Sequence, residues 1–95
     1  MAYRLHPRAE NDIYDIMVHI GGDNPAAALQ WQADLYETFA MLGDFPGTGV
    51  LRTTLKRKLR LFPKGNYLIF YQIAARHVVI LRVIHAARDW LKQIR

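Results

Sequence analysis

The chain of 95 residues contains no cysteine and no serine. The lack of cysteine excludes a disulfide framework and any thiolate metal site, and it fits a reducing compartment. Together, the two absences remove the commonest catalytic nucleophiles. The apolar share is 52%, with two tryptophans, five tyrosines and four phenylalanines, so a core can form without covalent or metal cross-links.

Long apolar runs are also missing. The longest are about five residues, whereas a helix that crosses a bilayer needs about 20. The first twelve residues, MAYRLHPRAEND, have no apolar stretch of the kind found in a secretory signal, and they already contain two acids. We therefore expect a single cytoplasmic domain that spans residues 1–95.

Acidic residues are scarce in the second half of the chain. Residues 1–50 hold two basic and seven acidic residues, a balance of −5. Residues 51–95 hold eleven basic residues and one acid, Asp89, a balance of +10. This clustering indicates a polyanionic partner, or a protein partner with an acidic segment, that meets the C-terminal half. The alternative is a solvated basic face on a small domain.

Motifs for metal and cofactor binding are absent as well. There is no glycine-rich phosphate loop, and no paired carboxylates lie near the basic region. The four histidines, at positions 6, 19, 77 and 85, lack the close spacing of metal ligands. The sequence thus predicts no cofactor and no metal, and leaves metal-free chemistry on phosphate, or binding alone.

Periodicity predicts the elements of the fold. Apolar spacings of three and four predict helices at residues 8–20 and 25–42, with Pro7 and Pro25 in their first turns and Gly21 or Gly22 as the cap between them. Alternation and β-branched or aromatic enrichment predict strands at 3–6, 57–62, 66–73 and 77–85, a loop at 43–49 and a short helix at 86–94. The fold class is α+β: an N-terminal strand, an antiparallel helical hairpin packed on one face of a small antiparallel sheet, and a short C-terminal helix. We expect the other face of the sheet to stay exposed or to meet a partner.

Cationic side chains on the last strands are the candidate functional residues. Alternation along 77–85 places Val78, Ile80, Arg82 and Ile84 on one face, so that Arg60, Arg82, His85 and Arg88 are able to converge near the polar face of the sheet. Convergent guanidinium groups suit a phosphate or an acidic segment, because each holds two oxygens at once. Two structural alternatives remain: Arg82 pairs with Asp89, or His85 ends its strand as a hydrogen-bonding group. The aromatic run Tyr67, Phe70 and Tyr71 fits core packing better than base stacking.

Four motifs carry a resemblance to a known family. Ala9, Asp12, Ile13 and Ile16 form A-x-x-D-I-x-x-I, and Leu42, Pro46, Gly49 and Arg52 form L-x-x-x-P-x-x-G-x-x-R. Residues 59–71 read L-R-x-F-P-x-G-N-Y-x-I-F-Y, and residues 80–89 read I-L-R-V-I-H-A-A-R-D. In this order and over nearly the whole chain, they resemble the ParE toxins of the RelE/ParE superfamily of bacterial toxin–antitoxin systems.

The resemblance implies a function and a set of partners. ParE-like toxins act on DNA gyrase without catalysis of their own and are neutralised by a co-expressed antitoxin whose tail wraps the toxin. The residues that we expect to contribute to target or antitoxin binding are Arg52, Lys58, Arg60, Arg82, His85 and Arg88. We expect an extended or helical antitoxin segment to cover the helical hairpin and the sheet edge, with acids near Arg60 and Arg82.

A related activity remains the alternative. RelE-like toxins share the fold but cleave mRNA on the ribosome without a metal, which requires cations on the scissile phosphate and a proton carrier. Here Arg60 and Arg82 would supply the cations and His85 the proton transfer. Against this, residues 89–95, DWLKQIR, hold neither the tyrosine nor the histidine that RelE-like nucleases usually carry in this region.

Overall fold

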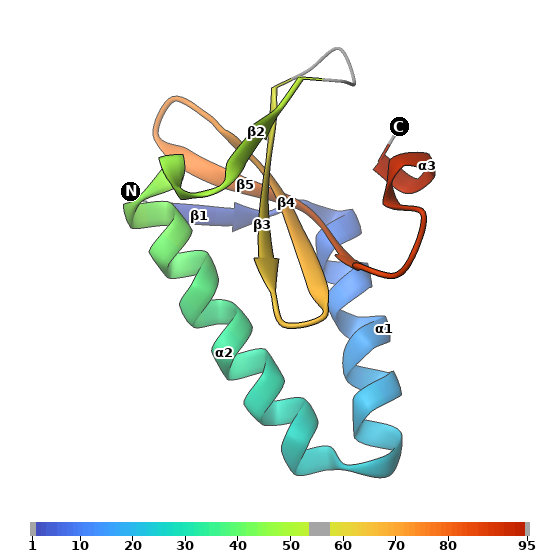
Figure 1. The fold of residues 1–95 in the computed structure, drawn as a ribbon. Helices are drawn as coiled ribbons and strands as arrows, with labels where there is room; N and C mark the ends of the chain where they lie inside the picture. The colour runs from blue at the N-terminus through green and yellow to red at the C-terminus, as the bar shows by residue number, and fades with distance from the viewer. Residues whose placement is uncertain (1, 54–57, 95) are drawn as a thin grey trace.

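The computed structural model describes residues 2–53 and 58–94. The elements are β1 (Ala2–Leu5), α1 (Pro7–Asp23), α2 (Pro25–Asp44), the 3-10 turn η1 (Pro46–Thr48), β2 (Val50–Arg52), β3 (Leu59–Lys64), β4 (Tyr67–Ile73), β5 (His77–His85) and α3 (Trp90–Ile94). The predicted α+β fold class is confirmed, and Figure 1 shows the helical hairpin of α1 and α2 beside the sheet, with its closed end reaching beyond the strands. Residue 57, where the strand predicted at 57–62 was expected to start, lies outside the described residues.

Local signals start both long helices where the sequence predicts. Pro7 and Pro25 occupy first-turn positions, which suits a residue that has no N–H to donate. The Nδ1 atom of His6 accepts from the Arg8 N–H at 3.1 Å, and the Oδ1 atom of Asn24 accepts from the Ala27 N–H at 3.0 Å. Each cap therefore satisfies one of the backbone donors that a helix start leaves unpaired.

The predicted glycine cap between the helices is wrong. Gly21 and Gly22 lie inside α1, which continues to Asp23, and Gly65 is the only described glycine with a positive φ, at 58°. The chain reverses instead at Asn24, whose extended backbone (φ −149°, ψ 90°) needs no left-handed residue. Gly65 occupies the turn between β3 and β4, where its left-handed conformation closes the hairpin.

The sheet has five strands in the order β1-β5-β4-β3-β2. The four strands from β2 to β5 are antiparallel neighbours, whereas β1 joins β5 in parallel, with Leu5 opposite Ile80. The parallel pair follows from the helical hairpin, which returns the chain to the far side of the sheet before β2 begins. Strand β2 was not predicted, because three residues are too few to show alternation.

A bulge in β5 changes which residues share a face. The register with β4 shifts so that Phe70 lies opposite Arg82 while Tyr71 lies opposite Ile80. The predicted common face of Val78, Ile80, Arg82 and Ile84 is therefore wrong beyond Ile80. Val83 joins the core under the helices and Ile84 joins the core on the opposite face, because one extra residue in a strand inverts the alternation that follows it.

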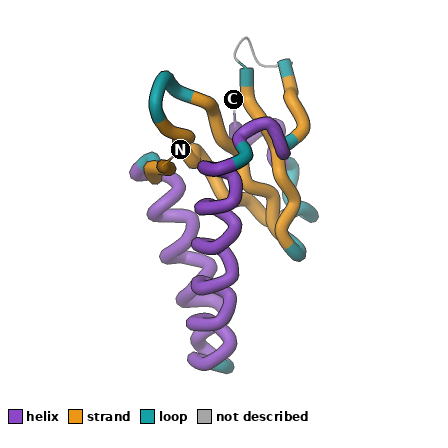
Figure 2. Tube along the Cα trace, turned by 90° about the vertical axis from the view of Figure 1, so that its left-hand side faces the viewer, coloured by secondary structure: helices purple, strands orange, loops and turns teal. Residues whose placement is uncertain are grey.

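Two apolar clusters hold the layers together. The larger lies between the helical hairpin and the sheet and includes Leu35, Phe39, Tyr71 and Ile80, all buried. The smaller lies on the other face and consists of Leu59, Leu61, Phe70, Ile84 and Ile94, with Trp90 against Phe70 at a ring-centroid distance of 5.4 Å. The expectation that this face stays exposed or meets a partner is thus corrected, because α3 covers part of it. Seen after a quarter turn, α1 and α2 lie together on one side of the strands (Figure 2).

The C-terminal helix is shorter than predicted. It begins at Trp90 rather than at residue 86, because the Trp90 N–H donates to the Arg88 carbonyl at 2.8 Å and not to the carbonyl of residue 86, as a helix from 86 would require. The Ala86 N–H donates to the Asn66 carbonyl at 2.8 Å, and the Arg88 N–H donates to the His85 carbonyl at 3.0 Å. None of the helices in the described ranges is both long and apolar enough to cross a membrane.

Candidate functional site

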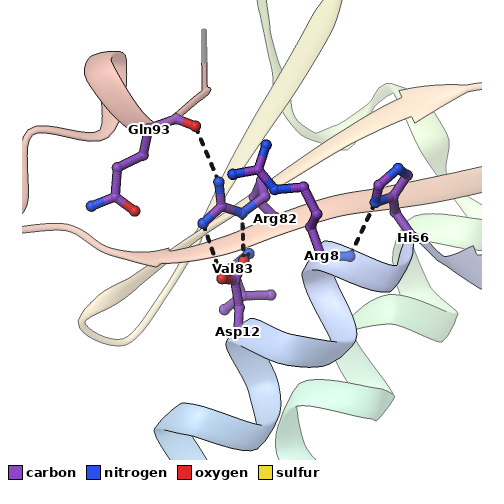
Figure 3. A network of polar contacts seen from close by, with 6 residues as sticks. All are labelled: His6, Arg8, Asp12, Arg82, Val83 and Gln93. Carbon is purple, nitrogen blue, oxygen red and sulfur yellow. Dashed lines mark hydrogen bonds and ion pairs between the residues drawn. The ribbon is translucent and has the colours of Figure 1, made fainter.

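Arg82, a residue of β5, contacts both α1 and α3 through its side chain (Figure 3). Its Nε atom donates to Asp12 Oδ2 at 2.7 Å and its Nη2 atom to Asp12 Oδ1 at 3.0 Å, a two-pronged ion pair. Its Nη1 atom donates to the Gln93 carbonyl at 3.1 Å, and the Val83 N–H donates to Asp12 Oδ2 at 3.0 Å. The side chains of Arg82 and Asp12 are only 12% and 16% exposed, so the pair is largely removed from water.

The fold explains why these groups meet. Strand β1 ends opposite Ile80, so the edge of β5 beyond it is free of a neighbouring strand. The first half of α1 and the end of α3 approach this open edge, where the bulge presents Arg82. The suggested pair between Arg82 and Asp89 is not formed; Asp89 instead lies 3.9 Å from the Lys92 amine on the surface.

His85 ends β5 as a hydrogen-bonding group. Its Nδ1 atom accepts from the Ala87 N–H at 3.0 Å, and its ring meets Tyr67 edge-on with centroids 5.2 Å apart. Tyr67 in turn meets Trp31 of α2 edge-on with centroids 5.4 Å apart, so the histidine lies at one end of a row of three rings. The structural alternative for His85 describes these contacts correctly.

A cleft of about 640 Å³ opens between α1 and the adjoining ends of β4 and β5. Its walls include Asp15 and His19 from α1 and Tyr67, His85 and Arg88 from the sheet side. Arg82 and Asp12 lie at its base, already paired with one another. The cleft therefore brings three of the candidate residues together, with acidic and basic groups on facing walls.

Arg60 lies elsewhere. It stands opposite Tyr71, which belongs to the core under the helices, whereas Arg82 stands opposite Phe70, which belongs to the core on the other face. Its Nη1 atom donates to the Gly49 carbonyl at 2.8 Å. The predicted convergence of Arg60 with Arg82, His85 and Arg88 is wrong, because β4 separates the two arginines and their strand positions face opposite ways.

The contact of Arg60 belongs to a network that fixes the turn before β2. The buried hydroxyl of Tyr71 donates to the Pro46 carbonyl at 2.8 Å and accepts from the Gly49 N–H at 2.8 Å. Burial raises the pKa of Tyr71, and the hydrogen bond from Gly49 and the charge of Arg60 partly oppose that rise. A methyl group added at Gly49 would lie 2.5 Å from this hydroxyl, so glycine is needed for the close approach.

Comparison with known proteins identifies the family. The family model described as "ParE toxin of type II toxin-antitoxin system, parDE" matches residues 3–90. The chain belongs to the ParE toxin family. This confirms the resemblance that the four motifs indicated. No protein of curated function is a significant match.

A solved structure supports the fold of this ParE toxin. A chain from the structure titled "Chromosomal ParDE TA system from P. aeruginosa" has a TM-score of 0.74 and 19% sequence identity. The match covers 90% of the present chain and 95% of that chain. At this identity the likeness is one of fold.

The motif residues of this ParE toxin contact one another across the structure. Asp12 of the first motif binds Arg82 of the last, and Gly49 of the second bonds to both Arg60 and Tyr71 of the third. The motif residues therefore form contacts that stabilise the fold, and two of the arginines predicted to bind a partner, Arg60 and Arg82, take part in these contacts. In contrast, Arg52, Lys58 and Arg88 are exposed, and in the described ranges none of their side-chain cations is engaged in a hydrogen bond or ion pair.

Sequence analysis missed a group of exposed apolar residues. Phe45, Val50 and Leu51 lie within seven positions of one another, at the end of α2 and on β2, and all are exposed. Phe45 lies in the predicted loop 43–49, and three strand residues are too few to show which side chains are buried. The sequence therefore does not indicate that these three residues are exposed. Within residues 2–53 and 58–94, no three histidine or acidic side chains are grouped as metal ligands.

Proposed function

We propose that this protein is a toxin that poisons DNA gyrase by direct contact, acts in the cytoplasm, catalyses nothing itself and is neutralised by a cognate antitoxin. The observation that carries the proposal is the family match over residues 3–90. The basic C-terminal half supports it, because cations that are exposed and unpaired suit contact with an acidic protein partner or a gyrase–DNA complex. Among the residues predicted to bind a target or antitoxin, Arg52, Lys58 and Arg88 are the exposed ones.

The arrangement of the candidate catalytic groups favours binding over RNA cleavage. A metal-free nuclease needs cations that converge on one phosphate beside a proton carrier. Arg60 is bonded to Gly49 and Arg82 to Asp12, on opposite sides of β4. The Arg82 guanidinium is already held by a carboxylate, and the two guanidinium groups do not share a site.

One observation keeps RNA cleavage as the second candidate. His85, Arg82 and Arg88 line the same cleft, and within the described chain the Nε2 atom of His85 has no hydrogen-bond partner. A ribosome-dependent nuclease would use His85 for proton transfer. On that candidate, His85→Ala lowers mRNA cleavage by about 100-fold. On the proposed function, gyrase inhibition survives His85→Ala as long as the binding geometry is retained.

The deciding experiment compares two reactions with toxin released from its antitoxin. Purified gyrase is assayed for supercoiling and for cleaved DNA, and a translation reaction is probed for cut mRNA. We expect loss of supercoiling, accumulation of cleaved DNA and intact mRNA. Cut mRNA with unaffected gyrase would reject the proposal in favour of the nuclease.

A further inference from the structure

A second, smaller pocket lies beside the ion pair of Arg82, between the start of α1, β5 and α3. Its volume is about 170 Å³, and we term it the Arg8 pocket. Three parts of the chain line it: His6 and Arg8 at the start of α1, Leu81 and Arg82 on β5, and Gln93 and Ile94 on α3. Of these six residues, only Arg82 and Gln93 also line the larger cleft, so the two hollows are distinct.

The side chains around the Arg8 pocket carry positive charge. Arg8 and Arg82 both line it, and Figure 3 shows the Arg8 guanidinium extending toward that of Arg82. The Asp12 carboxylate, bound to Arg82, offsets one of these two charges. Within the part of the chain that the structure describes, no acidic residue lines the pocket. With His6 neutral, the pocket keeps one uncompensated positive charge, which attracts an anion.

The arginines of the Arg8 pocket have hydrogen-bond donors to spare. A guanidinium group has five N–H groups, and Asp12 and Gln93 accept from three of those of Arg82. The guanidinium of Arg8, an exposed residue, makes no hydrogen bond or ion pair within residues 2–53 and 58–94. Donors of both arginines are therefore left for a ligand or for water.

His6 adds a further donor to the Arg8 pocket. Its Nδ1 atom accepts from the Arg8 N–H at 3.1 Å, so in the neutral ring the hydrogen lies on Nε2. Among the described residues, Nε2 has no hydrogen-bond partner. The backbone at the start of α1 offers no donor, because the N–H groups of residues 8–10 all bond to His6. Recognition of an anion would therefore fall to the side chains.

We propose that the Arg8 pocket binds one phosphate group, whose oxygens accept from Arg8, Arg82 and the Nε2 atom of His6. The pocket has the volume of about six water molecules, which is enough for a single group of this size. Guanidinium groups pair well with phosphate oxygens, and donors on two different elements suit a tetrahedral group better than a planar carboxylate. The proposal does not depend on the target of the toxin, because it rests on the pocket alone.

Nuclear magnetic resonance tests the proposal and locates the site. Inorganic phosphate is titrated into purified, isotopically labelled toxin, with chloride adjusted so that the ionic strength stays constant. We expect saturable shifts at the backbone amides of Arg8, Leu81 and Ile94, with a dissociation constant in the millimolar range. Shifts that do not saturate, or that leave these three amides unchanged, would overturn the proposal.

Two variants separate binding in the Arg8 pocket from a general effect of charge. Arg8→Ala and Arg76→Ala each remove one positive charge at an exposed position. Arg76 precedes β5 and lies five residues from Leu81, about 16 Å along an extended strand. We expect Arg8→Ala to raise the dissociation constant for phosphate at least about tenfold, and Arg76→Ala less than about twofold. Equal constants in two folded variants, as their spectra report, would overturn the proposal.

Two further titrations identify the chemistry and the source of the group. If acetate shifts the same amides as tightly as phosphate does, the pocket takes any oxyanion and the assignment to phosphate is wrong. A short DNA duplex tests whether the group belongs to nucleic acid. If the duplex shifts the three amides and Arg8→Ala weakens this binding, a backbone phosphodiester occupies the pocket; if only inorganic phosphate acts, the ligand is free phosphate.

Discussion

Single residues far apart in the chain decide how the layers of this toxin are joined. The carboxylate of Asp12 binds Arg82 and the Val83 N–H at once, so it links α1 to β5. Sequence reasoning could see that an arginine on an apolar strand needs a partner, but it offered Asp89, the nearest acid. The true partner lies 70 positions earlier, and only the return of the helical hairpin to the sheet brings it close.

Removing that carboxylate should be costly for stability. Asp12→Ala leaves the Arg82 guanidinium and the Val83 N–H largely buried without their acceptor. We expect the free energy of unfolding to fall by about 3 kcal/mol, measured by urea denaturation. Asp15→Ala, an exposed site on the same helix, is the control and should change it by less than about 0.5 kcal/mol. If Asp12→Ala lowered the free energy of unfolding no more than Asp15→Ala does, the ion pair between Asp12 and Arg82 would add nothing to stability.

The Tyr71 hydroxyl gives stability a dependence on alkaline pH. Burial raises the pKa of Tyr71 above 10.0, so above pH 10 the unfolded chain loses this proton while the folded chain keeps it. The unfolded state then binds fewer protons, and the free energy of unfolding falls as pH rises. Burial also raises the pKa of Tyr3, so part of the decline remains when Tyr71 is replaced.

Tyr71→Phe should therefore lower stability at neutral pH and flatten its decline above pH 10. At neutral pH we expect a loss of about 1–3 kcal/mol, because the Gly49 N–H and the Pro46 carbonyl lose their partner. Tyr14→Phe, at an exposed site, should retain the wild-type pH dependence. Urea titrations at several alkaline pH values provide the comparison, and parallel curves for wild type and Tyr71→Phe would contradict this role.

At the scale of elements, patterns that repeat within a segment were predictable and irregularities were not. The spacing of apolar residues predicted both long helices and the strands β4 and β5. Pro7 and Pro25 marked the starts of the two helices. The bulge in β5 and the short strand β2 did not follow, because an inserted residue or a three-residue strand leaves no periodic signal. The candidate site inherits these errors: the bulge sets the direction of Arg82, and β2 carries exposed apolar residues.

The turn that leads into β2 provides a test of how firmly that strand is placed. In Gly49→Ala the added methyl group would lie 2.5 Å from the hydroxyl of Tyr71, which is fully buried and cannot move aside freely. We expect a loss of about 2 kcal/mol in the free energy of unfolding, measured by urea denaturation.

Gly47→Ala is the matched control for this turn. No atom lies within 4 Å of the methyl group that it adds, so its stability should remain within about 0.5 kcal/mol of wild type. If Gly49→Ala were as stable as Gly47→Ala, the contact between Gly49 and Tyr71 would not determine the position of β2.

For the molecule as a whole, the basic residues of the C-terminal half fall into two groups, those bonded to the fold and those exposed on the surface. The sequence predicted a basic C-terminal half, but not which of its cations are occupied: Arg60 and Arg82 are tied to the fold, and Arg52, Lys58 and Arg88 are exposed. Sequence alone could not separate these groups, because the difference depends on long-range contacts. The exposed cations are those left to a partner, which is consistent with a toxin that acts by contact.

A contact mechanism differs from catalysis in its stoichiometry, and this provides the most direct test of the account. Wild-type toxin is titrated into a fixed amount of purified gyrase, supercoiling is measured after increasing times, and antitoxin is added at the end. We expect inhibition to require roughly one toxin per gyrase site, to stay constant with time at each ratio and to reverse when antitoxin is added. Progressive and complete loss of supercoiling at toxin levels far below those of gyrase, or no loss at any ratio, would contradict it.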